Sequence, residues 1–480
     1  MFIYAGIYDQ ILKHMFGILE FIDKIILAYN EYVGGYLLLL ILIPTGLYFS
    51  VRFKFLQLRK IGHSIQVISG KFDKEEDAGD INHFRALTTA LSATVGTGNI
   101  VGVALAIYWG GPGAILWMWL TGLLGMMLKF VECTLSLKFR KVNEDGSISG
   151  GPMYYMEKGL KDRFGNFAKL LAIIFAFATI VCSLGTGNIA QSNSISDVML
   201  TNYNIPTWLA GAILSVLVFM VIVGGIRRIA KITSRLVPLM AIMYFLACIL
   251  IIALFYKEIP HAFSMIISNA FTGTAATGGF IGSSLMMTIR FGVARGLFSN
   301  EGGQGSAAIA HAAAKTKYAA REGLVASVGP FIDTLIICTL TALVVILTGA
   351  WKGGVEGVGM TLEGFTNGLK VINLDFIGRH IVAIGLLLFA FSTMISWSYY
   401  GDRATEYLFG RRYLTHYRLV FVLFVFLGAI WGIDIVWHFV DMVITFMTIP
   451  NLIAMILLAG VVTKEVNHYF KGKYDKELPE

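Results

Sequence analysis

The stretch LSATVGTGNIVG, residues 91–102, places three glycines and the polar residues Thr94, Thr97 and Asn99 inside an apolar segment long enough to cross a lipid bilayer. A membrane helix ordinarily satisfies its backbone hydrogen bonds internally, because hydrocarbon offers no partners. This stretch therefore predicts an interrupted helix whose freed N–H and C=O groups are satisfied by neighbouring side chains or by a ligand.

The rest of the chain has the composition of an α-helical membrane protein. Of its 480 residues 56% are hydrophobic and 14% are charged, whereas about 25% of a soluble domain is charged. The alternating segments of a membrane β-barrel do not occur. The four cysteines lie far apart in apolar runs, so neither a disulfide framework nor a paired-cysteine metal site is expected. The amino-terminal residues lack the pattern of a signal peptide, and we expect none.

We expect eleven membrane-spanning helices. Their predicted ranges are 34–52, 86–108, 112–138, 168–198, 206–224, 234–256, 277–311, 323–349, 380–399, 419–432 and 435–462. Residues 1–33 are expected to form an amphipathic helix on the outer membrane face, and residues 463–480 a cytoplasmic tail.

The distribution of Lys and Arg predicts the orientation in the membrane. Of the 38 basic residues, 28 lie in the connections 51–85, 137–166, 225–235, 311–324, 400–418 and 463–480. The positive-inside rule places these connections in the cytoplasm and the amino terminus outside. The net charge of +8 is therefore a topology signal of a multi-pass plasma-membrane protein in contact with the lipid bilayer, and no nucleic-acid partner is expected.

A second glycine-rich interruption occurs in GLFSNEGGQGSAAIAHAAA, residues 296–314. Each interrupted span is the first of five consecutive predicted spans. The chain therefore divides into an added helix at 34–52 and two five-helix halves, 86–256 and 277–462, of opposite orientation. Interrupted helices at corresponding positions of two inverted halves are typical of secondary transporters and mark the binding site at the bilayer midplane.

The chemistry of the interruptions fits a carboxylate and a hard cation. The amino ends of half-helices carry partial positive charge and attract a carboxylate. Freed carbonyls together with Thr, Ser and Asn oxygens suit a cation such as Na⁺. The alternative is that the glycines are helix-packing contacts, but the intramembrane acid Glu301 favours the functional interpretation.

Three stretches resemble the sodium:alanine/glycine symporter family: 95–132, 149–160 (SGGPMYYMEKGL) and 294–314. The resemblance covers nearly the whole chain from about residue 35. It implies an all-α, leucine-transporter-type fold with a five-plus-five inverted repeat and one additional amino-terminal helix, working as a monomer. It also implies uptake of a small neutral amino acid, alanine or glycine first, together with Na⁺ as the co-transported ion.

Three positions depart from the pattern of that family. Leu116 stands where the family usually has Phe, and residues 302 and 304 are Gly and Gln where it more often has Ala and Leu. A polar amide at Gln304 leaves a more polar substrate, such as serine or glutamine, open.

The resemblance also implies roles for individual residues. The substrate contacts it implies are Thr97, Gly98, Phe298, Ser299 and Gln304, with Asn188 and Gln191 from the third core helix. Sodium near the substrate would use Thr94, Asn99 and Ser299; a second sodium would use carbonyls of Ser92 and Val95 and hydroxyls of Ser392 and Thr393. The alternatives are interhelical hydrogen bonds for Asn188 and Gln191, bonds within their own helix for Ser392 and Thr393, and a core aromatic role for Phe298.

Acidic residues inside predicted spans are functional candidates because a buried charge in lipid is costly. By the resemblance, Glu132 supports the unwound segments and is not an ion ligand. Asp333 either faces the sodium region or pairs with a cation, and Asp441 is either functional or structural. Glu301 is expected close enough to Arg295 to pair with it.

His311 is interpreted as a helix residue with satisfied hydrogen bonds, in preference to a proton relay. The predicted function is sodium-coupled symport by alternating access. A proton-coupled carrier titrating Glu132, Asp333 or His311 is the main alternative. A membrane enzyme or a channel is more distant, because no HExxH, GxSxG or phosphate-loop motif occurs and the polar residues concentrate at two interruptions.

Overall fold

The computed structural model describes residues 24–74, 76–272 and 284–472, of which 433–436 and 471–472 are described by their backbone alone. Most of the predicted amphipathic stretch 1–33, the first residues of the predicted span 277–311 and the end of the tail lie outside these ranges.

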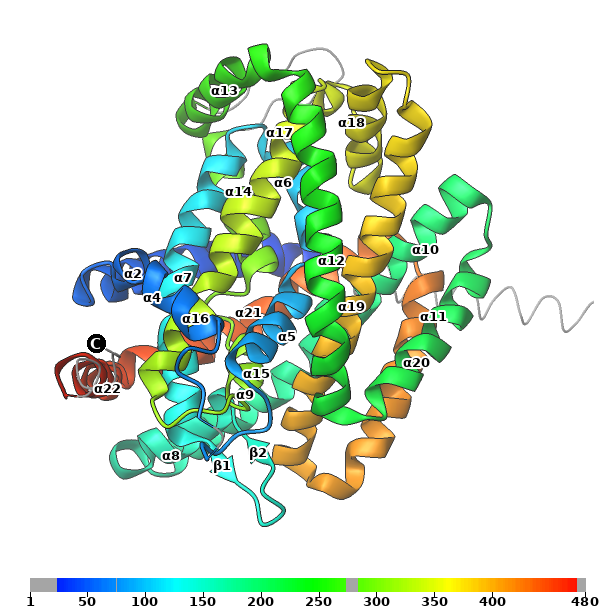
Figure 1. Ribbon diagram of the computed structural model, residues 1–480. Coiled ribbons are helices and arrows are strands. Elements are labelled where there is room, and N and C mark those ends of the chain that lie inside the picture. Colours follow the sequence, from blue (N-terminus) through cyan, green and yellow to red (C-terminus); the bar gives the residue numbers. More distant parts are fainter. Residues whose placement is uncertain (1–23, 75, 273–283, 473–480) are drawn as a thin grey trace, which may run out of the picture.

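Within the described residues nearly every element is a helix, and the strands are the two-residue β1 and β2, which pair antiparallel (Figure 1). The first elements are η1 (Asn30–Gly34), α2 (Gly35–Arg52), α3 (Leu56–Arg59), α4 (Ile61–Ile68), α5 (His83–Thr94), η2 (Gly98–Gly102), α6 (Val103–Gly110), α7 (Ala114–Phe139), β1 (Lys141–Val142), β2 (Ile148–Ser149), α8 (Pro152–Phe164), α9 (Asn166–Leu184), η3 (Gly185–Ile189), α10 (Ala190–Tyr203), α11 (Thr207–Ile222) and α12 (Gly225–Leu254).

The second part of the chain continues in the same way. Its elements are η4 (Tyr256–Glu258), α13 (Ile259–Thr272), α14 (Leu285–Asn300), α15 (Ser306–His311), α16 (Ala319–Pro330), η5 (Phe331–Cys338), α17 (Thr339–Leu347), η6 (Ala350–Lys352), α18 (Val358–Lys370), α19 (Asp375–Phe409), η7 (Arg411–Tyr413), α20 (Leu414–Ile430), α21 (Ile433–Leu457) and α22 (Ala459–Gly472).

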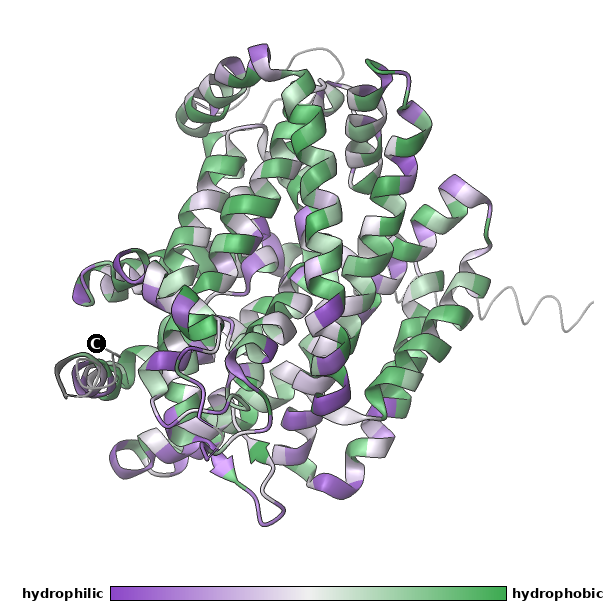
Figure 2. Ribbon diagram, in the orientation of Figure 1, coloured by the Kyte–Doolittle hydropathy of each residue, from purple (hydrophilic) through white to green (hydrophobic). Residues whose placement is uncertain are grey.

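The long helices have the length and the surface of membrane spans. Eight helical runs in the described residues are long and apolar enough to cross a bilayer, and the pair α5 and η2–α6 makes a ninth if it is counted as one bent span. Apolar side chains such as Val216, Leu239 and Leu246 are exposed, where lipid would cover them. Figure 2 shows that hydrophobic residues predominate along α11, α12 and α20. The prediction of a multi-pass α-helical membrane protein is confirmed.

Several boundaries differ from the predicted ones. The helix of the first span already includes Lys24, and the connection between the predicted spans 323–349 and 380–399 contains helix α18. The predicted span 277–311 is two helices, because three residues between α14 and α15, Glu301, Gly303 and Gly305, have positive φ and cannot continue a right-handed helix. The predicted span 435–462 ends at Leu457, and the predicted tail begins inside helix α22.

Helices α7 and α19 form the centre of the molecule. In the most apolar 18-residue stretch of each of these two helices, 72% of the residues are buried. The corresponding share is 33% in α12 and 28% in the helical run that contains α20. Helix α7 packs against α14 and α16, and α19 packs against α5, α9 and α12. The two interrupted helices therefore lie against the most buried part of the bundle.

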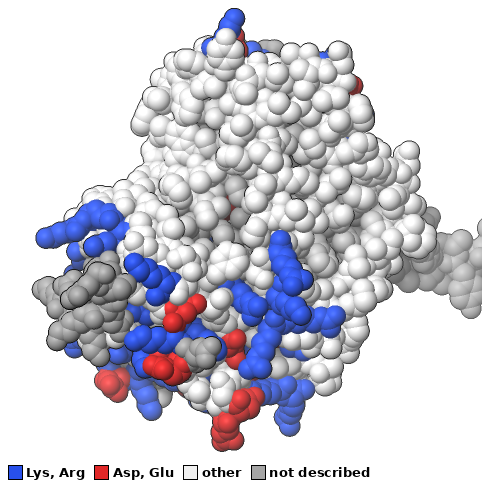
Figure 3. Space-filling view, viewed as in Figure 1, with Lys and Arg blue, Asp and Glu red and all other residues white. Residues whose placement is uncertain are grey.

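Basic side chains gather at one end of the molecule, around α4, α8, the β1–β2 hairpin and the start of α12 (Figure 3). We call this the basic end. Helices α13 and α18 lie at the opposite end, where Lys and Arg are few on the face shown.

Candidate functional site

The first interruption lies between α5 and α6, whose axes differ by 52°. Helix α5 ends at Thr94, and the chain resumes as the π-helical turn η2 at Gly98. The freed N–H of Gly96 donates to Asn99 Oδ1 at 3.0 Å, and that of Thr97 donates to Gln191 Oε1 at 3.2 Å. Uncharged side-chain amides therefore satisfy this break, as an interrupted membrane helix requires.

Asn99, Ser299 and Asp333 meet where the first break faces the second interrupted helix. The Asn99 amide donates to the Asp333 carboxylate and to Ser299 Oγ, at 3.2 Å. Ser299 Oγ in turn donates to Asp333 Oδ1 at 3.0 Å. Thr334 Oγ1 lies 3.2 Å from Asp333 Oδ2, and Cys338 Sγ lies 3.1 Å from Ser299 Oγ. We call these five residues, which come from η2, α14 and η5, the Asp333 cluster.

The Asp333 cluster has the chemistry of a site for a hard cation. It offers one carboxylate with hydroxyl and amide oxygens, and all five side chains are at most 2% exposed. Asp333, whose partner the sequence left open, is thus in contact with Asn99 and Ser299. Thr94 Oγ1 instead bonds within α5, to the carbonyls of Ala90 and Leu91 at 3.3 Å each.

Hydroxyl groups join α5 to α19 beside the first break. The carbonyl of Ser92 accepts hydrogen bonds from Thr393 Oγ1 at 3.0 Å and from Ser392 Oγ at 3.3 Å. Ser396 Oγ adds a bond to Ser92 Oγ at 2.9 Å. The structure therefore brings Ser92, Ser392 and Thr393 together. It adds Ser396, which the four-residue spacing from Ser392 could have identified.

The first break leaves no room for larger residues. A Cβ at Gly96 would lie 2.4 Å from Thr393 Oγ1. A Cβ at Gly98 would lie 3.1 Å from both Phe298 Cδ1 and the Cα of Ser299. Glycine at these positions lets the two interrupted helices and α19 approach one another closely.

An aromatic layer lies on the other side of Gly98. The Phe298 ring is 4% exposed and packs edge-on against Trp437 at 5.2 Å. The guanidinium of Arg295 lies 5.3 Å from the Trp437 ring and forms an ion pair with Asp441. The predicted pairing of Arg295 with Glu301 is therefore wrong, since Glu301 turns away with positive φ at the end of α14.

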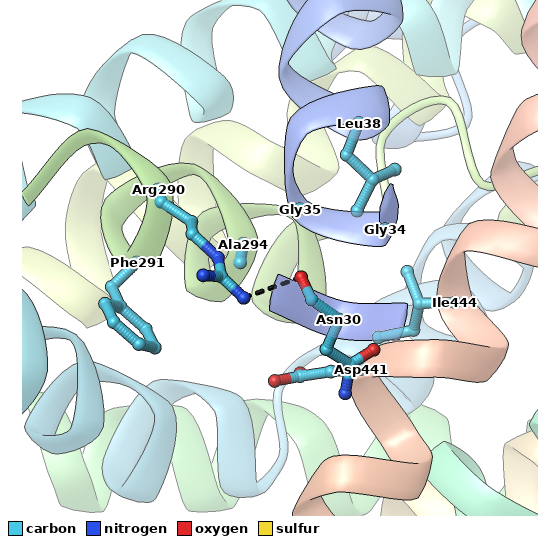
Figure 4. Close-up of a pocket in the computed structure, with 9 residues that line it drawn as sticks. All are labelled: Asn30, Gly34, Gly35, Leu38, Arg290, Phe291, Ala294, Asp441 and Ile444. Atoms are coloured by element: carbon cyan, nitrogen blue, oxygen red, sulfur yellow. Dashed lines mark hydrogen bonds between the residues drawn. The ribbon is translucent and has the colours of Figure 1, made fainter. Parts of the chain in front are cut away.

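A small pocket adjoins this layer (Figure 4). It lies between η1 and α2, α14 and α21, and Arg290 Nη2 donates to the backbone carbonyl of Asn30 across it at 2.6 Å. Asp441 lines the pocket and also pairs with Arg295. In the described residues, none of the five members of the Asp333 cluster lines this pocket.

Acidic side chains hold the second break. Glu132 Oε2 accepts hydrogen bonds from the N–H of Gly305 at 3.1 Å and from the amide of Asn451 at 3.0 Å, and the same amide donates to the carbonyl of Gly303 at 2.8 Å. Glu132 therefore contacts an unwound segment, the geometry that its predicted supporting role requires. Asn451 was not among the predicted site residues, although an asparagine in an apolar helix is itself a signal.

Glu301 is bonded on both carboxylate oxygens. Trp397 Nε1 donates to Oε1 at 3.0 Å, and Ser306 Oγ donates to Oε2. Lys129, one turn before Glu132 on α7, is 1% exposed and interacts electrostatically with Glu132, Glu301 and Asp333.

The remaining predicted residues lie in different surroundings. Gln191 contacts the first break through Thr97, whereas the Asn188 amide donates to the Phe421 carbonyl on α20 at 2.7 Å. Gln304 Nε2 lies 3.8 Å from Met447 Sδ on α21. In the described residues no hydrogen bond joins Gln304 to the first break. Val95 N bonds to Leu91 O, and His311 bonds to Glu322.

Comparison with known proteins identifies the family of this chain. The profile of the Sodium:alanine symporter family matches residues 19–480. An uncharacterized transporter of Haemophilus influenzae is 44% identical over 95% of this chain and 99% of its own length. The sodium/alanine symporter AgcS of Methanococcus maripaludis is 42% identical over 92% of this chain and 95% of its own length.

Two further proteins define the range of similarity. The probable sodium/glutamine symporter GlnT of Bacillus subtilis is 33% identical over 97% of this chain and 92% of its own length. The crystal structure of MhsT in complex with L-phenylalanine matches with a TM-score of 0.54 at 14% identity, covering 81% of this chain and 99% of that chain, which shows a shared transporter fold. The whole-length match to the profile and to these relatives places the chain in the sodium:alanine symporter family.

Proposed function

We propose that this sodium-coupled amino-acid symporter takes up a small neutral amino acid, alanine or glycine first, by alternating access. One observation carries the proposal. The two interrupted helices meet at the Asp333 cluster, beside the backbone amides of the first break. Family membership makes the chain a transporter and not an enzyme.

The first sodium would bind at the Asp333 cluster. The carboxylate of Asp333 supplies the charge, and the oxygens of Asn99, Ser299 and Thr94 supply further ligands once their present hydrogen bonds are exchanged for the ion. The cation would neutralise a carboxylate that is otherwise buried in a low-dielectric interior.

The substrate carboxylate would dock on the N–H groups of Thr97 and Gly98, at the amino end of the η2–α6 half-helix. Gln191 Oε1 accepts the N–H of Thr97 at 3.2 Å, so this neutral side chain holds the position that the carboxylate would take. Phe298 would close over the bound amino acid, with Trp437 behind it.

A second sodium would bind between α5 and α19. The carbonyls of Ser92 and Val95 and the hydroxyls of Ser392 and Thr393 would be its ligands, and Ser396 adds a hydroxyl to the set. An ion here would tie the first interrupted helix to the central helix α19, and its release would free α5 to move.

The residues proposed to bind sodium are all buried. No residue named in the two sodium sites is more than 5% exposed. We propose that the basic end faces the cytoplasm in the plasma membrane, with the amino terminus outside, and that the monomer alternates between openings at the two ends. Each charge that crosses contributes about 2.3 kcal/mol per 100 mV, which is enough to concentrate the substrate.

We also propose that the chain has eleven spans arranged as a five-plus-five inverted repeat with one added helix. The division into an added helix at 34–52 and halves at 86–256 and 277–462 is equally a proposal. One of the two breaks lies in the first predicted span of each half.

A more polar substrate is the alternative that a specific observation favours. Gln304 carries a buried amide oxygen without a hydrogen-bond partner in the described part of the chain, and the GlnT relative is 33% identical. Competition by a panel of L- and D-amino acids would distinguish alanine or glycine from serine or glutamine.

Uptake of labelled alanine into proteoliposomes tests the proposal. Wild-type protein should accumulate alanine under an inward sodium gradient, and Asn99→Ala and Ser299→Ala should each abolish it. The matched controls are Asn193→Ala and Ser327→Ala, which change buried side chains outside the site. Asn193 donates to the carbonyls of Gly428 and Trp431, and Ser327 donates to the carbonyl of Leu324 on its own helix, α16. Unchanged uptake in both site variants would remove the site assignment, and uptake driven by a proton gradient without sodium would favour the proton-coupled alternative.

A further inference from the structure

At the basic end, the two interrupted helices are tied together by their backbones. The segment that leads into α5 pairs with the segment that follows α15, through a bridge between Ile81 and Ala314. The N–H of Asp80 donates to the carbonyl of Ala313 at 2.8 Å, and the N–H of Lys315 donates to the carbonyl of Ile81 at 2.8 Å. Opening this end of the molecule requires these bonds to break.

Arg140, directly after α7, strengthens the same junction. Its guanidinium donates to carbonyls of both segments, which are those of Ala78, Ala312, Ala314 and Thr316, at 2.7 to 3.1 Å. We call residues 78–83 and 311–316, with Arg140 and Glu322, the basic-end clasp.

A histidine–glutamate–histidine cluster lies inside the clasp. His83 Nδ1 bonds to Glu322 Oε2, and His311 Nδ1 bonds to Glu322 Oε1 at 2.5 Å. The three side chains come from α5, α15 and α16 and are at most 1% exposed. One carboxylate thus joins both interrupted helices to the helix that follows them.

The geometry leaves a place for a proton. Because both Nδ1 atoms face the carboxylate, both carry hydrogen and donate, and each neutral ring then keeps a basic Nε2. Both Nε2 atoms are buried without a hydrogen-bond partner in the described residues. With neutral histidines the cluster carries the negative charge of Glu322, which a proton would cancel.

The partly exposed side chain of Asp73 lies between His83 Nε2 and solvent. Its Oδ1 lies 3.7 Å from His83 Nε2, and its side chain is 35% exposed whereas that of His83 is fully buried. A proton on His83 Nε2 would convert this approach into a charge-assisted hydrogen bond.

The surrounding charges are mixed in sign and do not replace this proton. The charged and titratable groups that act on the cluster are Asp73, Cys133, Arg140 and Arg321, with Asp77 and Asp80 beside Arg140 and Tyr469 beside Arg321. Arg321 is held by three aromatic rings and by the carbonyl of Phe72, and Arg140 is held by four carbonyls of the clasp.

We propose that the His83–Glu322–His311 cluster binds one proton from solvent, and that this proton holds the basic-end clasp closed. The proton adds to His83 Nε2, the resulting imidazolium pairs with Asp73 and Glu322, and the proton returns to solvent when α5 and α15 separate. The inference rests on the proposed function, because the clasp governs transport only if this end opens during the cycle.

Hydrogen exchange of the full-length protein tests the proton site without measuring transport. After correction for intrinsic exchange, clasp peptides of the wild type should be protected about tenfold more at about pH 6 than at about pH 8, the range in which an ordinary histidine titrates. In His83→Gln this pH dependence should fall below about twofold, because the amide can bond to Glu322 but cannot take the proton.

Two further variants keep the test decisive. Asp73→Asn, at a partly exposed position, should reduce the pH dependence even if His83→Gln does not fold. His380→Gln changes a histidine that bonds to Tyr203 outside the clasp and should keep the wild-type profile. A flat wild-type profile, or one that neither His83→Gln nor Asp73→Asn changes, would overturn the proposal.

Sodium-driven uptake measured at the same pH values separates this proposal from the proposed function. Absence of uptake at every pH would count against the function, whereas the exchange profile alone decides whether the cluster binds a proton.

Discussion

The two breaks share one sequence signature, glycines among polar residues in an apolar helix, but they are satisfied by different chemistry. In the first, neutral amides from Asn99 and Gln191 accept the freed N–H groups. In the second, the carboxylate of Glu132 accepts the N–H of Gly305, with Asn451 bonded beside it. Neutral partners are cheaper to exchange than a buried, bonded charge. The first break therefore suits an exchangeable ligand, and the second suits a fixed joint.

Removing Glu132 should give the largest effect on stability. Glu132→Ala leaves the N–H of Gly305 and one amide bond of Asn451 without an acceptor, and each unsatisfied buried group costs about 1–3 kcal/mol. We expect thermal unfolding in detergent to shift down by several degrees. Glu465→Ala removes a partly exposed ion pair with Lys138 and should change stability by about 1 kcal/mol or less. An unfolding temperature for Glu132→Ala equal to that of the wild type would contradict the interpretation of the second break as a fixed joint.

Asp333→Asn should impair transport while leaving the fold in place. The amide keeps the shape of the carboxylate but loses the charge that attracts sodium, so we expect sodium-driven uptake to fall at least about tenfold, equivalent to 1.4 kcal/mol or more. The unfolding temperature should remain near that of the wild type. Asp375→Asn, at an exposed position in the first turn of α19, is the control. If Asp333→Asn unfolds as readily as Glu132→Ala, the two breaks do not differ as we describe.

These two carboxylates also show how far the sequence could predict the site. Glycines within apolar runs predicted both breaks, because the cost of free backbone groups in lipid is a local property. The partner of Asp333 depends on how η5 packs against η2 and α14, which no local pattern specifies. Closeness along the chain suggested that Arg295 pairs with Glu301, but the positive φ of Glu301 turns its side chain to Trp397 and Ser306.

The alanine-rich run after the second break shows a further limit of sequence reasoning. Residues 306–314 have strong helix propensity, yet α15 ends at His311 because the chain then pairs with the segment before α5. Tertiary bonding overrode local preference. The multi-pass helical fold, by contrast, followed from composition and from the lengths of the apolar runs.

The second sodium site should show a smaller effect than Asp333. Ser392→Ala and Thr393→Ala each remove one hydroxyl from the carbonyl of Ser92, and we expect the sodium concentration for half-maximal uptake to rise about three- to tenfold, since one neutral ligand contributes about 1 kcal/mol. Ser398→Ala is the control, because this buried serine on the same helix bonds only to the Ile395 carbonyl among the described contacts. If Ser392→Ala and Thr393→Ala keep the same sodium dependence as Ser398→Ala and the wild type, sodium binds only at the Asp333 cluster.

The smallest effect is expected outside both breaks, at His63 on α4. Burial, with the positive charges of Lys60 and Arg321, lowers the pKa of His63 to about 4. The folded-state pKa is below the unfolded value of about 6.5, so the neutral form stabilises docking of α22 fully above about pH 6.5 and this stabilisation is lost as the pH falls toward 4. Hydrogen exchange of α22 should increase over that range, and His63→Gln should remove the change. This dependence is opposite in sign to that of the clasp, and a clasp-like increase in protection at low pH would contradict it.

Equilibrium binding of labelled alanine to the purified protein, in sodium chloride and in choline chloride, tests the central claim most directly. Wild-type protein should bind alanine only with sodium, and Asp333→Asn should bind at background level in both salts. Binding that is unchanged by removing sodium, or by Asp333→Asn, would contradict the assignment of the first break as the shared site of ion and substrate.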